Sequence, residues 1–400
     1  MKHLIRILGF STMLFLALAL PAAAQDSKCV QCHRAATPGV VRDWQAGKMG
    51  NKVDCATCHG NQHTTAADAA RAKMPTASTC ATCHEKKAKE FQGGKHAAAW
   101  VAMNAMPRTA SQPAPMIDGR SGCGSCHSIG KDGGKCDSCH TRHTFSVQEA
   151  RSPQACQTCH MGFDHPQWEM WSTSKHGTIY LTDKASGRAP TCQTCHMPKG
   201  DHGVLTAWGF LALRLPENDP AWLQDRVTIL KALGVLDPQG NPTPRLDVVK
   251  AGNVARLTAA DWQRERDKMV KICGQCHGSS FASRQLEAGD RMIDTSDHLM
   301  AEAIEVVAGL YHDGIIAKPA GYAYAYPDLL TFYDAATPIE QKLYEMLMEY
   351  RMRAFQGVFH GNPDYAHWYG YAPLKTALVE VQAEAQRMRQ AAGKPLPEKR

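Results

Sequence analysis

CGSCHSIGKDGGKCDSCH, residues 123–140, carries two copies of the pattern Cys-x-x-Cys-His in close succession. The same pattern occurs six more times along the 400-residue chain. Because each of the eight copies uses two cysteines, together they account for all 16 cysteines of the protein. The placement of the cysteines is therefore more informative than their number. The eight copies are Cys29/Cys32/His33, Cys55/Cys58/His59, Cys80/Cys83/His84, Cys123/Cys126/His127, Cys136/Cys139/His140, Cys156/Cys159/His160, Cys192/Cys195/His196 and Cys273/Cys276/His277.

The spacing within the pattern suits covalent haem attachment. Two thiols separated by two residues can bond both vinyl groups of one haem, and the adjacent histidine then reaches the iron. Structural zinc sites use Cys-x-x-Cys pairs without needing a histidine after each one. Disulfides predict no trailing histidine, and redox pairs of the thioredoxin type do not come in eights. We therefore predict eight covalently bound c-type haems.

The first 24 residues are typical of an export signal. Lys2 and Arg6 form a basic start, an apolar run follows over residues 7–20, and small residues lead to a cleavage position after Ala24. The alternative is a retained anchor helix, but a run of 14 residues is short for a membrane span. No later segment is apolar and long enough to cross a membrane. We therefore expect an exported protein, located in the periplasm if the source is a bacterium.

Composition limits the class of protein further. Hydrophobic residues make up 44% of the chain and charged residues 21%, which argues against a largely disordered protein. The formal net charge is +7, but each haem would add two propionates that largely offset it. No compact patch of Lys and Arg with interleaved aromatic residues occurs, so the sequence argues against nucleic-acid binding.

The chain divides by the density of its motifs. Seven motifs fall between Cys29 and His196, which leaves room only for short helices and loops wrapped on haem. Residues 107–122, rich in Pro, Ser and Gly, are a candidate boundary or loop. The predicted regions are a signal peptide over 1–24, a three-haem region over 25–106, a dense haem region over 107–215 and a helical region with the eighth haem over 216–400.

The region after residue 216 has helical periodicity. Asp219 followed by Pro220 predicts a helix start, and apolar residues three and four apart continue in later segments. No strand-like alternation of any length occurs, so the predicted class is mainly α, a haem-packed N-terminal part with long C-terminal helices. We expect helices over 220–233, 259–272, 284–311, 338–359 and 374–391. The apolar face of 338–359, interpreted as core or subunit packing, is Leu343, Met346, Leu347, Tyr350, Ala354, Phe355 and Val358.

The number of histidines limits how the irons are coordinated. The eight motif histidines are the expected proximal ligands. Electron-transfer haems usually need a second His or Met, whereas a haem that reacts with a small ligand keeps one position open. After the predicted signal peptide, ten spare histidines can serve seven or eight irons, so the count permits an open site without proving one. These ten are His63, His96, His143, His165, His176, His202, His298, His312, His360 and His367.

His165 differs from the other spare histidines because an acid, Asp164, directly precedes it. The pair follows the sixth motif by only a few residues. An acid beside an imidazole is what proton delivery to a bound substrate would use. We therefore treat Asp164 and His165 as candidate catalytic residues rather than as haem ligands.

The residues between and around the motifs also form distinctive short sequence blocks. In the dense region, CHTRH (139–143) is followed by FS (145–146), EAR (149–151), DH (164–165), WE (168–169) and SKHG (174–177). Further blocks are TPG (37–39), DW (43–44), MPT (74–76), APTC (189–192) and HGNP (360–363). These blocks resemble the sequences of the octahaem hydroxylamine oxidoreductase family of multihaem c-type cytochromes. The resemblance covers nearly the whole chain after residue 24.

The resemblance by itself implies several roles. The fourth motif, with His127, would hold the catalytic five-coordinate haem, and Asp164 and His165 would be the distal pair above it. A seventh distal histidine of the family is replaced here by Met49, five residues after Trp44. Met49 would bind one iron and raise its potential, or that iron would recruit His298, His312 or His367. Six distal ligands carry over, namely His63, His96, His143, His176, His202 and His360.

One departure from the family bears on the direction of the chemistry. Hydroxylamine-oxidising members carry a tyrosine that cross-links to the catalytic haem of a neighbouring subunit. In NPDYAHWYG (362–370) that position falls on His367 or Trp368, and Tyr365 and Tyr369 lie one or two residues away. Taken as written, the sequence lacks the cross-link. It then resembles the members that reduce nitrite or hydroxylamine.

Three functions remain open at this point. The first is reduction of nitrite, and of NO or hydroxylamine, to ammonia, with seven haems conducting electrons to the open one. The second is oxidation of hydroxylamine to NO or nitrite on the same scaffold. The third is a non-catalytic electron-transfer or electron-storage cytochrome. An open coordination site separates the two enzymes from the third function, and the tyrosine cross-link separates the two enzymes from each other.

The expected partners follow from these functions. The substrate would be a small inorganic nitrogen compound, and electrons would come from a redox partner such as a c-type cytochrome or a quinol-linked cytochrome. The resemblance also implies a homotrimer held by the C-terminal helices, to which residues 338–359 could contribute.

Overall fold

The structure is a computed structural model that describes residues 27–395, apart from 51, 104–121, 207–213, 252–257, 319–321, 323 and 332–333. The predicted signal peptide and residues 107–121 of the candidate boundary lie outside the described residues. The described residues form helices and loops, with one isolated bridge between Leu236 and Pro242 and no β-strand. This confirms the mainly α class. Among the described helices, none combines the length and apolar character that crossing a membrane requires.

Two compact units can be distinguished in the chain. Unit 1 takes in residues up to Pro75 together with His140–Ser146, and unit 2 takes in Thr76–Cys139 and everything from Val147 onward. The fifth motif therefore contributes its cysteines to unit 2 and its histidine to unit 1. The three regions expected from motif density stay a prediction.

Unit 1 has short helices around a very small core. The hydroxyl of Ser27 accepts a hydrogen bond from Val30 N and so caps the first helix. Val30, Val41 and Trp44 form the apolar cluster, and Trp44 Nε1 donates to the Val53 carbonyl at 3.1 Å. Three side chains are too few to stabilise a unit by apolar burial alone. Its helices are α1 (Lys28–Ala36), α2 (Pro38–Ala46), α3 (Cys55–His59) and the 3-10 helix η2 (Ala66–Arg71).

Several haem motifs are themselves single helical turns. Three of them coincide with five-residue helices, namely α3, α8 (Cys123–His127) and α13 (Cys192–His196). Residues three apart lie on the same face of a helix, so such a turn presents both thiols on one side. The third motif is different, because α4 (Ala77–Gln92) continues beyond it for a total of 16 residues. The expectation of only short helices in this part was therefore wrong for α4.

The other elements between residues 98 and 200 are short. They are α5 (Ala98–Ala102), η4 (Ser128–Gly133), η5 (Cys136–Ser138), α9 (Val147–Ala150), α10 (Gln154–Gln157), α11 (Gln167–Ser172), α12 (Lys175–Thr182), η6 (Lys184–Ser186) and η7 (Pro198–Gly200). Such brief segments leave much backbone in loops, as the dense motifs predicted. Loops of this kind need partners other than each other to become ordered.

The C-terminal helices form where the periodicity predicted them. Asp219 caps the first of them by accepting a hydrogen bond from Trp222 N, and Pro220 is its first residue. A further helix, α15 (Pro244–Ala251), was not predicted. The predicted helices are α14 (Pro220–Ala232), α16 (Ala259–Cys273), α17 (Ser279–His312) and α21 (Ala372–Ala391).

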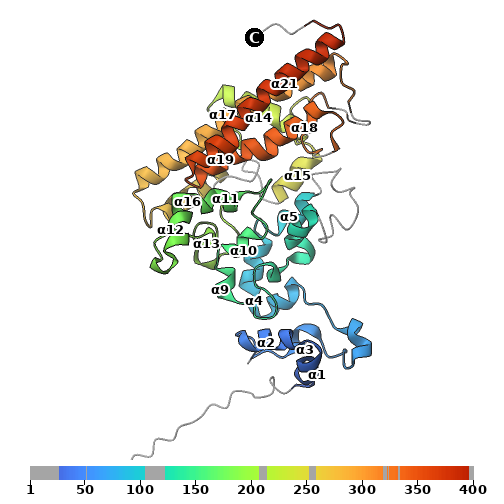
Figure 1. Ribbon diagram of the computed structural model, residues 1–400, viewed down its shortest axis with the longest axis vertical. Coiled ribbons are helices and arrows are strands. Elements are labelled where there is room, and N and C mark those ends of the chain that lie inside the picture. Colours follow the sequence, from blue (N-terminus) through green and yellow to red (C-terminus); the bar gives the residue numbers. More distant parts are fainter. Residues whose placement is uncertain are drawn as a thin grey trace, which may run out of the picture. The chain divides into compact units, whose positions relative to one another are not determined.

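These helices pack as a bundle. In Figure 1, α17, α19 (Met352–Phe359) and α21 lie side by side, and α14 packs against α17. Their shared core is apolar, with Ile229, Met300, Ile304, Leu347 and Leu374 completely or almost completely buried. Burial of this many aliphatic side chains is the main source of stability in a helical domain.

The predicted helix over residues 338–359 contains an irregular turn. It consists of α18 (Pro338–Glu345), the π-helical segment η9 (Met346–Arg351) and α19. A second π-helical segment, η10 (Ala366–Tyr371), follows the short α20 (Pro363–Tyr365). A Cβ on Gly370 would collide with the backbone of Ala354, so this glycine permits the close approach of η10 to α19. Single π-helical turns are frequent at functional sites, and a 3.6-residue periodicity cannot predict them.

Candidate functional site

Six motif histidines face six of the spare histidines. One iron between two imidazoles binds each nitrogen at about 2 Å, which separates the ring centroids by about 6 Å. The observed centroid separations run from 5.9 to 6.2 Å. This is the spacing that one haem iron between two rings requires. The facing rings are His33 and His63, His59 and His143, His160 and His96, His127 and His165, His277 and His176, and His196 and His360.

Hydrogen bonds at Nδ1 orient many of these rings. A carbonyl oxygen can only accept, so a histidine bonded to one through Nδ1 carries its proton there and keeps the Nε2 lone pair for a metal. Backbone carbonyls of Lys73, Ala99, Leu205 and Gln356 serve His59, His127, His196 and His360 at 2.7–3.0 Å. Side-chain partners are Thr37 for His33, Asp68 for His63 and Gln167 for His160.

Burial keeps several of these imidazoles neutral. Desolvation lowers the pKa of His160 and of His360 to about 4, and it lowers the pKa of His96, His127 and His196 as well. A metal ligand must be unprotonated at the nitrogen that binds. The residues present therefore fit haem iron in both charge and orientation.

Thiols of different motifs lie next to one another in unit 2. Hydrogen bonds join Cys136 to Cys80, Cys156 to Cys192 and Cys159 to Cys126. Each thiol is an expected attachment point, so these contacts bring the third motif to the fifth, and the fourth and seventh motifs to the sixth. Closely spaced attachment points are what electron transfer between neighbouring haems requires.

Other motif thiols approach one another less closely. Burial raises the pKa of Cys195 to about 11, and the thiols of Cys273 and Cys276 add to this rise, so the eighth motif lies near the seventh. In unit 1, burial raises the pKa of Cys55, and the thiol of Cys29 acts in the same direction. The first motif therefore lies near the second.

Cys32, Cys58 and Cys83 are further predicted attachment thiols. Cys32 of α1 and Cys83 of α4 are exposed, whereas Cys58 of α3 is half-buried. The Sγ of Cys83 accepts a hydrogen bond at 3.8 Å from the hydroxyl of Thr82, its neighbour in the chain. The assignment of Cys32, Cys58 and Cys83 to haem attachment, like that of the other motif cysteines, stays a prediction.

The fourth motif faces the candidate catalytic pair. The ring centroids of His127 and His165 are 6.1 Å apart, with the ring planes nearly perpendicular. His165 Nδ1 lies 3.1 Å from a carboxylate oxygen of Asp164, and the side chain of Asp164 is half exposed. Hydrogen bonding to His165 lowers the pKa of Asp164, so this carboxylate is ionised and accepts from the imidazole.

Side chains from neighbouring helices hold the loop that carries this pair. Glu169 of α11 accepts a hydrogen bond from Gly162 N at 2.9 Å. Arg353 of α19 donates to the carbonyl of Phe163, the residue before Asp164. Two anchors on a short loop fix the position of the catalytic pair against the fourth motif.

A second contact ties the same region to α19. Gln167 accepts a hydrogen bond from His160 Nδ1 at 3.2 Å and itself donates to Gln356 at 2.8 Å. Asn362 donates to the carbonyl of Met170 at 2.9 Å. The bundle therefore positions the sixth motif and α11 through side-chain amides.

Four further predicted ligands complete the set. They are His84, His140, His202 and Met49. His202 Nδ1 lies 2.9 Å from the Gly200 carbonyl, and its backbone nitrogen donates to Glu90 of α4, the helix that carries His84. Met49 is half-buried in unit 1, which also contains His140. The roles of these four residues stay predictions.

The spare histidines considered as substitutes for Met49 lie elsewhere. His298 is largely exposed and pairs with Asp225 at 3.1 Å. His312 is also exposed and pairs with Asp313 at 3.1 Å. His367 packs edge-on against Trp368, with ring centroids 4.7 Å apart. All three belong to unit 2, whereas Met49 belongs to unit 1.

Comparison with known proteins agrees with the motif analysis. The family model described as "Seven times multi-haem cytochrome CxxCH" matches residues 25–210 and 245–321. The chain belongs to this multihaem cytochrome family. A curated relative, the "Probable nitrite reductase-hydroxylamine oxidoreductase fusion protein" of Kuenenia stuttgartiensis, is 27% identical over 91% of the chain. The chain spans about half of that relative's length, 52%.

Solved structures show the same fold. A reducing HAO-like protein complex of Kuenenia stuttgartiensis matches with a TM-score of 0.70 and 24% identity, covering 91% of this cytochrome and 85% of that chain. A hypothetical multihaem protein matches with a TM-score of 0.69 and 19% identity, covering 91% and 96%. The resemblance to the hydroxylamine oxidoreductase family is thus confirmed, and this multihaem cytochrome is related to oxidoreductases that act on nitrogen compounds.

Sequence reasoning missed the residues that support the candidate ligands of this cytochrome. Asp68 lies five residues after His63, so a carboxylate near a spare histidine was a usable signal. The backbone carbonyls that orient the other rings carry no such signal. Arg353 and Gln356 are far from the haem motifs in sequence, and only the fold brings them to the sixth motif.

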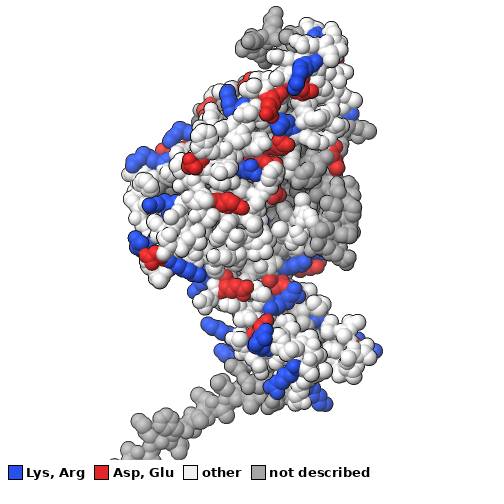
Figure 2. Space-filling model, in the orientation of Figure 1, with Lys and Arg blue, Asp and Glu red and all other residues white. Residues whose placement is uncertain are grey.

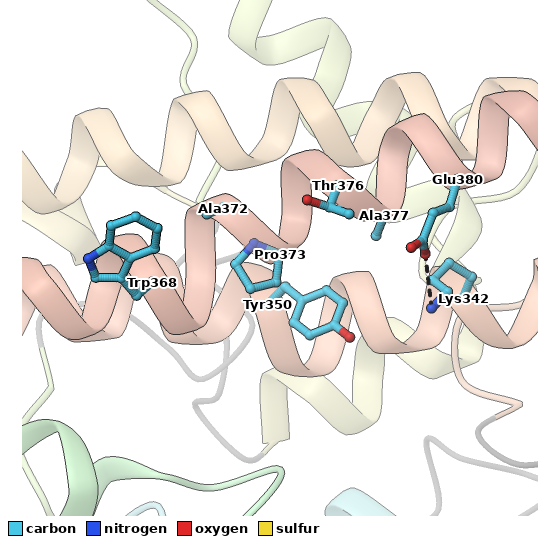
Figure 3. Close-up of a pocket in the computed structure, with 8 residues that line it drawn as sticks. All are labelled: Lys342, Tyr350, Trp368, Ala372, Pro373, Thr376, Ala377 and Glu380. Atoms are coloured by element: carbon cyan, nitrogen blue, oxygen red, sulfur yellow. Dashed lines mark ion pairs between the residues drawn. The ribbon is translucent and has the colours of Figure 1, made fainter.

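A surface pocket lies on the C-terminal helices, away from the motif residues. It measures about 310 Å³ and is lined by Lys342, Tyr350, Trp368, Ala372, Pro373, Thr376, Ala377 and Glu380. Figure 3 shows the ion pair between Lys342 and Glu380 at one end of the pocket and Trp368 at the other. On the face drawn in Figure 2, basic and acidic side chains of these helices are interspersed rather than gathered by sign.

Proposed function

We propose that this multihaem cytochrome is a periplasmic octahaem enzyme that reduces nitrite, or NO or hydroxylamine, to ammonia. The reaction would take place at a five-coordinate haem attached to Cys123 and Cys126, with His127 as its proximal ligand. Seven further haems would deliver electrons. Reduction of nitrite to ammonium consumes six electrons and eight protons and releases two water molecules, so the site must supply both electrons and protons.

The observation that carries the proposal is the placement of Asp164 and His165 opposite His127. His165 lies across from the proximal ring, with the ring centroids 6.1 Å apart, so it belongs to the distal side of the same candidate haem. His165 is also hydrogen-bonded to an ionised acid. An imidazole in this position can hold a proton at Nε2 and donate it to a bound nitrogen or oxygen atom.

Each residue of the candidate catalytic site then has a defined role. The thiols of Cys123 and Cys126 hold the haem, and the Ala99 carbonyl fixes the orientation of His127. Asp164 keeps His165 oriented and stabilises its protonated form. When bound, the haem iron supplies electrons to the substrate and a site for its nitrogen atom.

The remaining facing rings are proposed as axial pairs of electron-transfer haems. His84 and His140 would be proximal ligands of two more, with His202 and Met49 as the distal ligands. Methionine ligation raises the potential of a haem relative to histidine ligation. The Met49 haem would then be the most readily reduced of the electron-transfer set.

The absence of a tyrosine at the family's cross-link position supports reduction over oxidation. That position falls on His367 or Trp368, and Trp368 is 63% exposed. An unmodified haem can donate electron density into an N–O bond. The name of the structural relative, a reducing HAO-like complex, agrees with this direction, whereas the name of the fusion protein contains both a nitrite reductase and a hydroxylamine oxidoreductase.

A second candidate function is electron transfer without catalysis. The separation between His127 and His165 is the same as in the five other facing pairs, so His165 could itself be the sixth ligand of that iron. The cytochrome would then have no open coordination site. Ligand binding separates the two candidates, because only a five-coordinate haem takes up cyanide or nitric oxide readily.

The proposed partners are a small nitrogen compound, a c-type or quinol-linked cytochrome that donates electrons, and two further copies of the chain. The HAO-like structural relative is named as a complex. Exposed Trp368 and Tyr369 on the C-terminal helices provide apolar surface for contact between copies.

The decisive experiment uses holoprotein purified from the periplasm of a host that attaches c-type haem. Haem content and mass should give eight haems per chain. With nitrite and a reduced viologen dye, ammonia should form at the rate of dye oxidation, and cyanide should change the spectrum of one haem. A protein that binds neither cyanide nor nitric oxide would refute the enzyme and leave the electron-transfer function.

A further inference from the structure

Glu349 is a buried carboxyl group close to the candidate catalytic pair. The residue is 2% exposed and lies in the π-helical segment η9. Its Oε2 is 3.5 Å from Arg353 Nη2, and its Oε1 has no hydrogen-bond partner among the described residues. A buried and partly satisfied carboxylate is costly, so such a group tends to carry a proton. The haem ligation scheme gives Glu349 no task.

Arg353 connects Glu349 to the loop of the catalytic pair. Its guanidinium donates to the Phe163 carbonyl and lies over the Phe163 ring at 5.2 Å. Phe163 directly precedes Asp164, and the charge of Asp164 acts on Glu349. A row of polar groups therefore leads from Glu349 past Arg353 to Asp164 and His165.

The electrostatic surroundings allow Glu349 to gain and lose a proton near neutral pH. Burial raises the pKa of Glu349 to about 7. Among the nearby charges, Arg353 and Lys342 lower this pKa, whereas Glu345 and Asp164 raise it. Glu349 is therefore protonated below about pH 7 and ionised above it.

The helices packed against η9 add few free charges on this side. Lys342 is shared between Glu345 at 2.8 Å and Glu380 of α21 at 3.3 Å. The buried acid of α17, Asp297, accepts hydrogen bonds from Arg226 and Arg351. Segment η10 also packs against η9, and its titratable residues are His367, Tyr369 and Tyr371.

We propose that Glu349 is a proton relay that reloads the Asp164–His165 pair after that pair has protonated the substrate. The inference rests on the proposed function. In the relay step an O–H bond of Glu349 breaks and an O–H bond forms on Asp164, which restores to the pair the one proton that it gave to the substrate. The negative charge left on Glu349 lies beside Arg353 until water returns a proton. No electron moves in this step, because the redox partner supplies the electrons separately.

The pocket in Figure 3 borders η9, the helical segment that carries Glu349. Tyr350, the residue after Glu349, lines it together with Lys342 and Trp368. In the proposed relay, solvent on this side of the bundle returns the proton to Glu349, whereas Asp164 is half exposed on the loop that carries the catalytic pair.

The test replaces Glu349 by glutamine, which keeps the size and removes the exchangeable proton. We expect Glu349→Gln to lower ammonia formation from nitrite about 10-fold or more, which is less than the roughly 100-fold or more contributed by a proton donor that acts directly on the substrate. The wild-type rate should fall as the pH rises through about 7, because the donor form disappears. The variant should lose this pH limb, while haem content, redox titration and KM for nitrite stay unchanged.

Two controls separate a relay from a structural role. Glu384→Gln changes an exposed glutamate of α21 that pairs with Arg387 and should leave the rate and pH profile as in wild type. Glu345→Gln removes a negative charge that raises the pKa of Glu349, so it should move the pH limb to lower pH. A wild-type rate and profile in Glu349→Gln would overturn the proposal.

An infrared titration keeps the inference distinct from the proposed function. The wild-type holoprotein should show a protonated carboxyl band that disappears as the pH rises through about 7, and Glu349→Gln should lack it. If nitrite and hydroxylamine are not turned over but the band is present, the proposed function fails while the titrating carboxyl stands. If turnover is normal and the band is unaffected by Glu349→Gln, the relay fails alone.

Discussion

The haem-dense part of unit 2, residues 122–139 and 147–206, and the bundle of α14 to α21 are stabilised in different ways. The bundle buries a large contiguous set of aliphatic side chains, and several of them are completely inaccessible. In the dense part the buried apolar residues are few, chiefly Met170, Trp171 and Tyr180. Its side chains instead form facing imidazoles and adjacent thiols. One region is held by side-chain packing, and the other is arranged around a cofactor.

The difference also appears in how buried polar groups are satisfied. In the dense part, backbone carbonyls orient neutral imidazoles so that Nε2 stays available. In the bundle, one carboxylate, Asp297, is shared by Arg226, Arg351 and the indole of Trp222. The first arrangement is incomplete without a metal, whereas the second pairs its buried charges with one another within the protein.

The largest expected effect comes from withholding haem. When the chain is expressed in the cytoplasm, where c-type haem is not attached, the dense part should stay unfolded because its core is missing. The bundle should keep much of its helical structure. Circular dichroism combined with limited proteolysis should show cleavage between residues 122 and 206 and protection of fragments from residues 258–395.

A haem-free chain that resists proteases over residues 122–206 would contradict the comparison. The matched control removes a single haem by changing Cys273 and Cys276 to serine. That change leaves seven attachment sites intact, so protection of residues 122–206 should persist.

The next effect concerns the buried ion cluster of the bundle. Asp297→Asn should destabilise the holoprotein by about 3–5 kcal/mol, because two buried guanidinium groups lose their counter-charge. Urea unfolding followed by far-UV circular dichroism measures the change. Asp225→Asn is the control, because its partner His298 is largely exposed and such pairs contribute about 1 kcal/mol or less. Equal stability of the two variants would show that the cluster is not a structural element.

The two regions also differ in what the sequence could predict. The bundle helices follow from apolar spacing and from capping residues such as Asp219, since both act locally. The haem motifs could be recognised because the covalent bonds to the haem vinyl groups fix the spacing of the two cysteines. The facing of His160 and His96 depends on chain paths through loops, which local sequence does not encode. The π-helical turn that buries Glu349 was missed for a related reason, since it departs from the 3.6-residue repeat.

A third prediction tests whether the dense part is a catalyst as well as a conductor. His165→Ala should reduce ammonia formation from nitrite by about 100-fold, the lower range of general acid catalysis. Haem content should not change, because His165 is in no attachment motif. His298→Ala, at an exposed histidine of α17, serves as the control. If His165→Ala instead converts an inert haem into one that binds cyanide, His165 was an axial ligand.

A smaller effect is expected from Met49→Ala. If Met49 binds an iron, its loss should lower the potential of one step in a redox titration or change that haem's spin state. The control is Met74→Ala, at a 65% exposed methionine of unit 1. Circular dichroism should be unchanged in both variants. A titration of Met49→Ala identical to the wild type would assign the ligand elsewhere.

The smallest effect should come from changing Trp368, because we expect no covalent bond between the bundle and the catalytic haem. Trp368 lies at the family's cross-link position, is 63% exposed and lines the surface pocket rather than a haem motif. Trp368→Phe should therefore leave the optical spectrum and the denatured mass of each haem peptide as they are in the wild type. Tyr365→Phe and Tyr369→Phe extend the test to the neighbouring tyrosines, whose rings stack at 4.9 Å. A haem peptide that carries an additional C-terminal fragment in the wild type and loses it in one of these variants would reverse the assignment, since a cross-linked haem is typical of hydroxylamine oxidation.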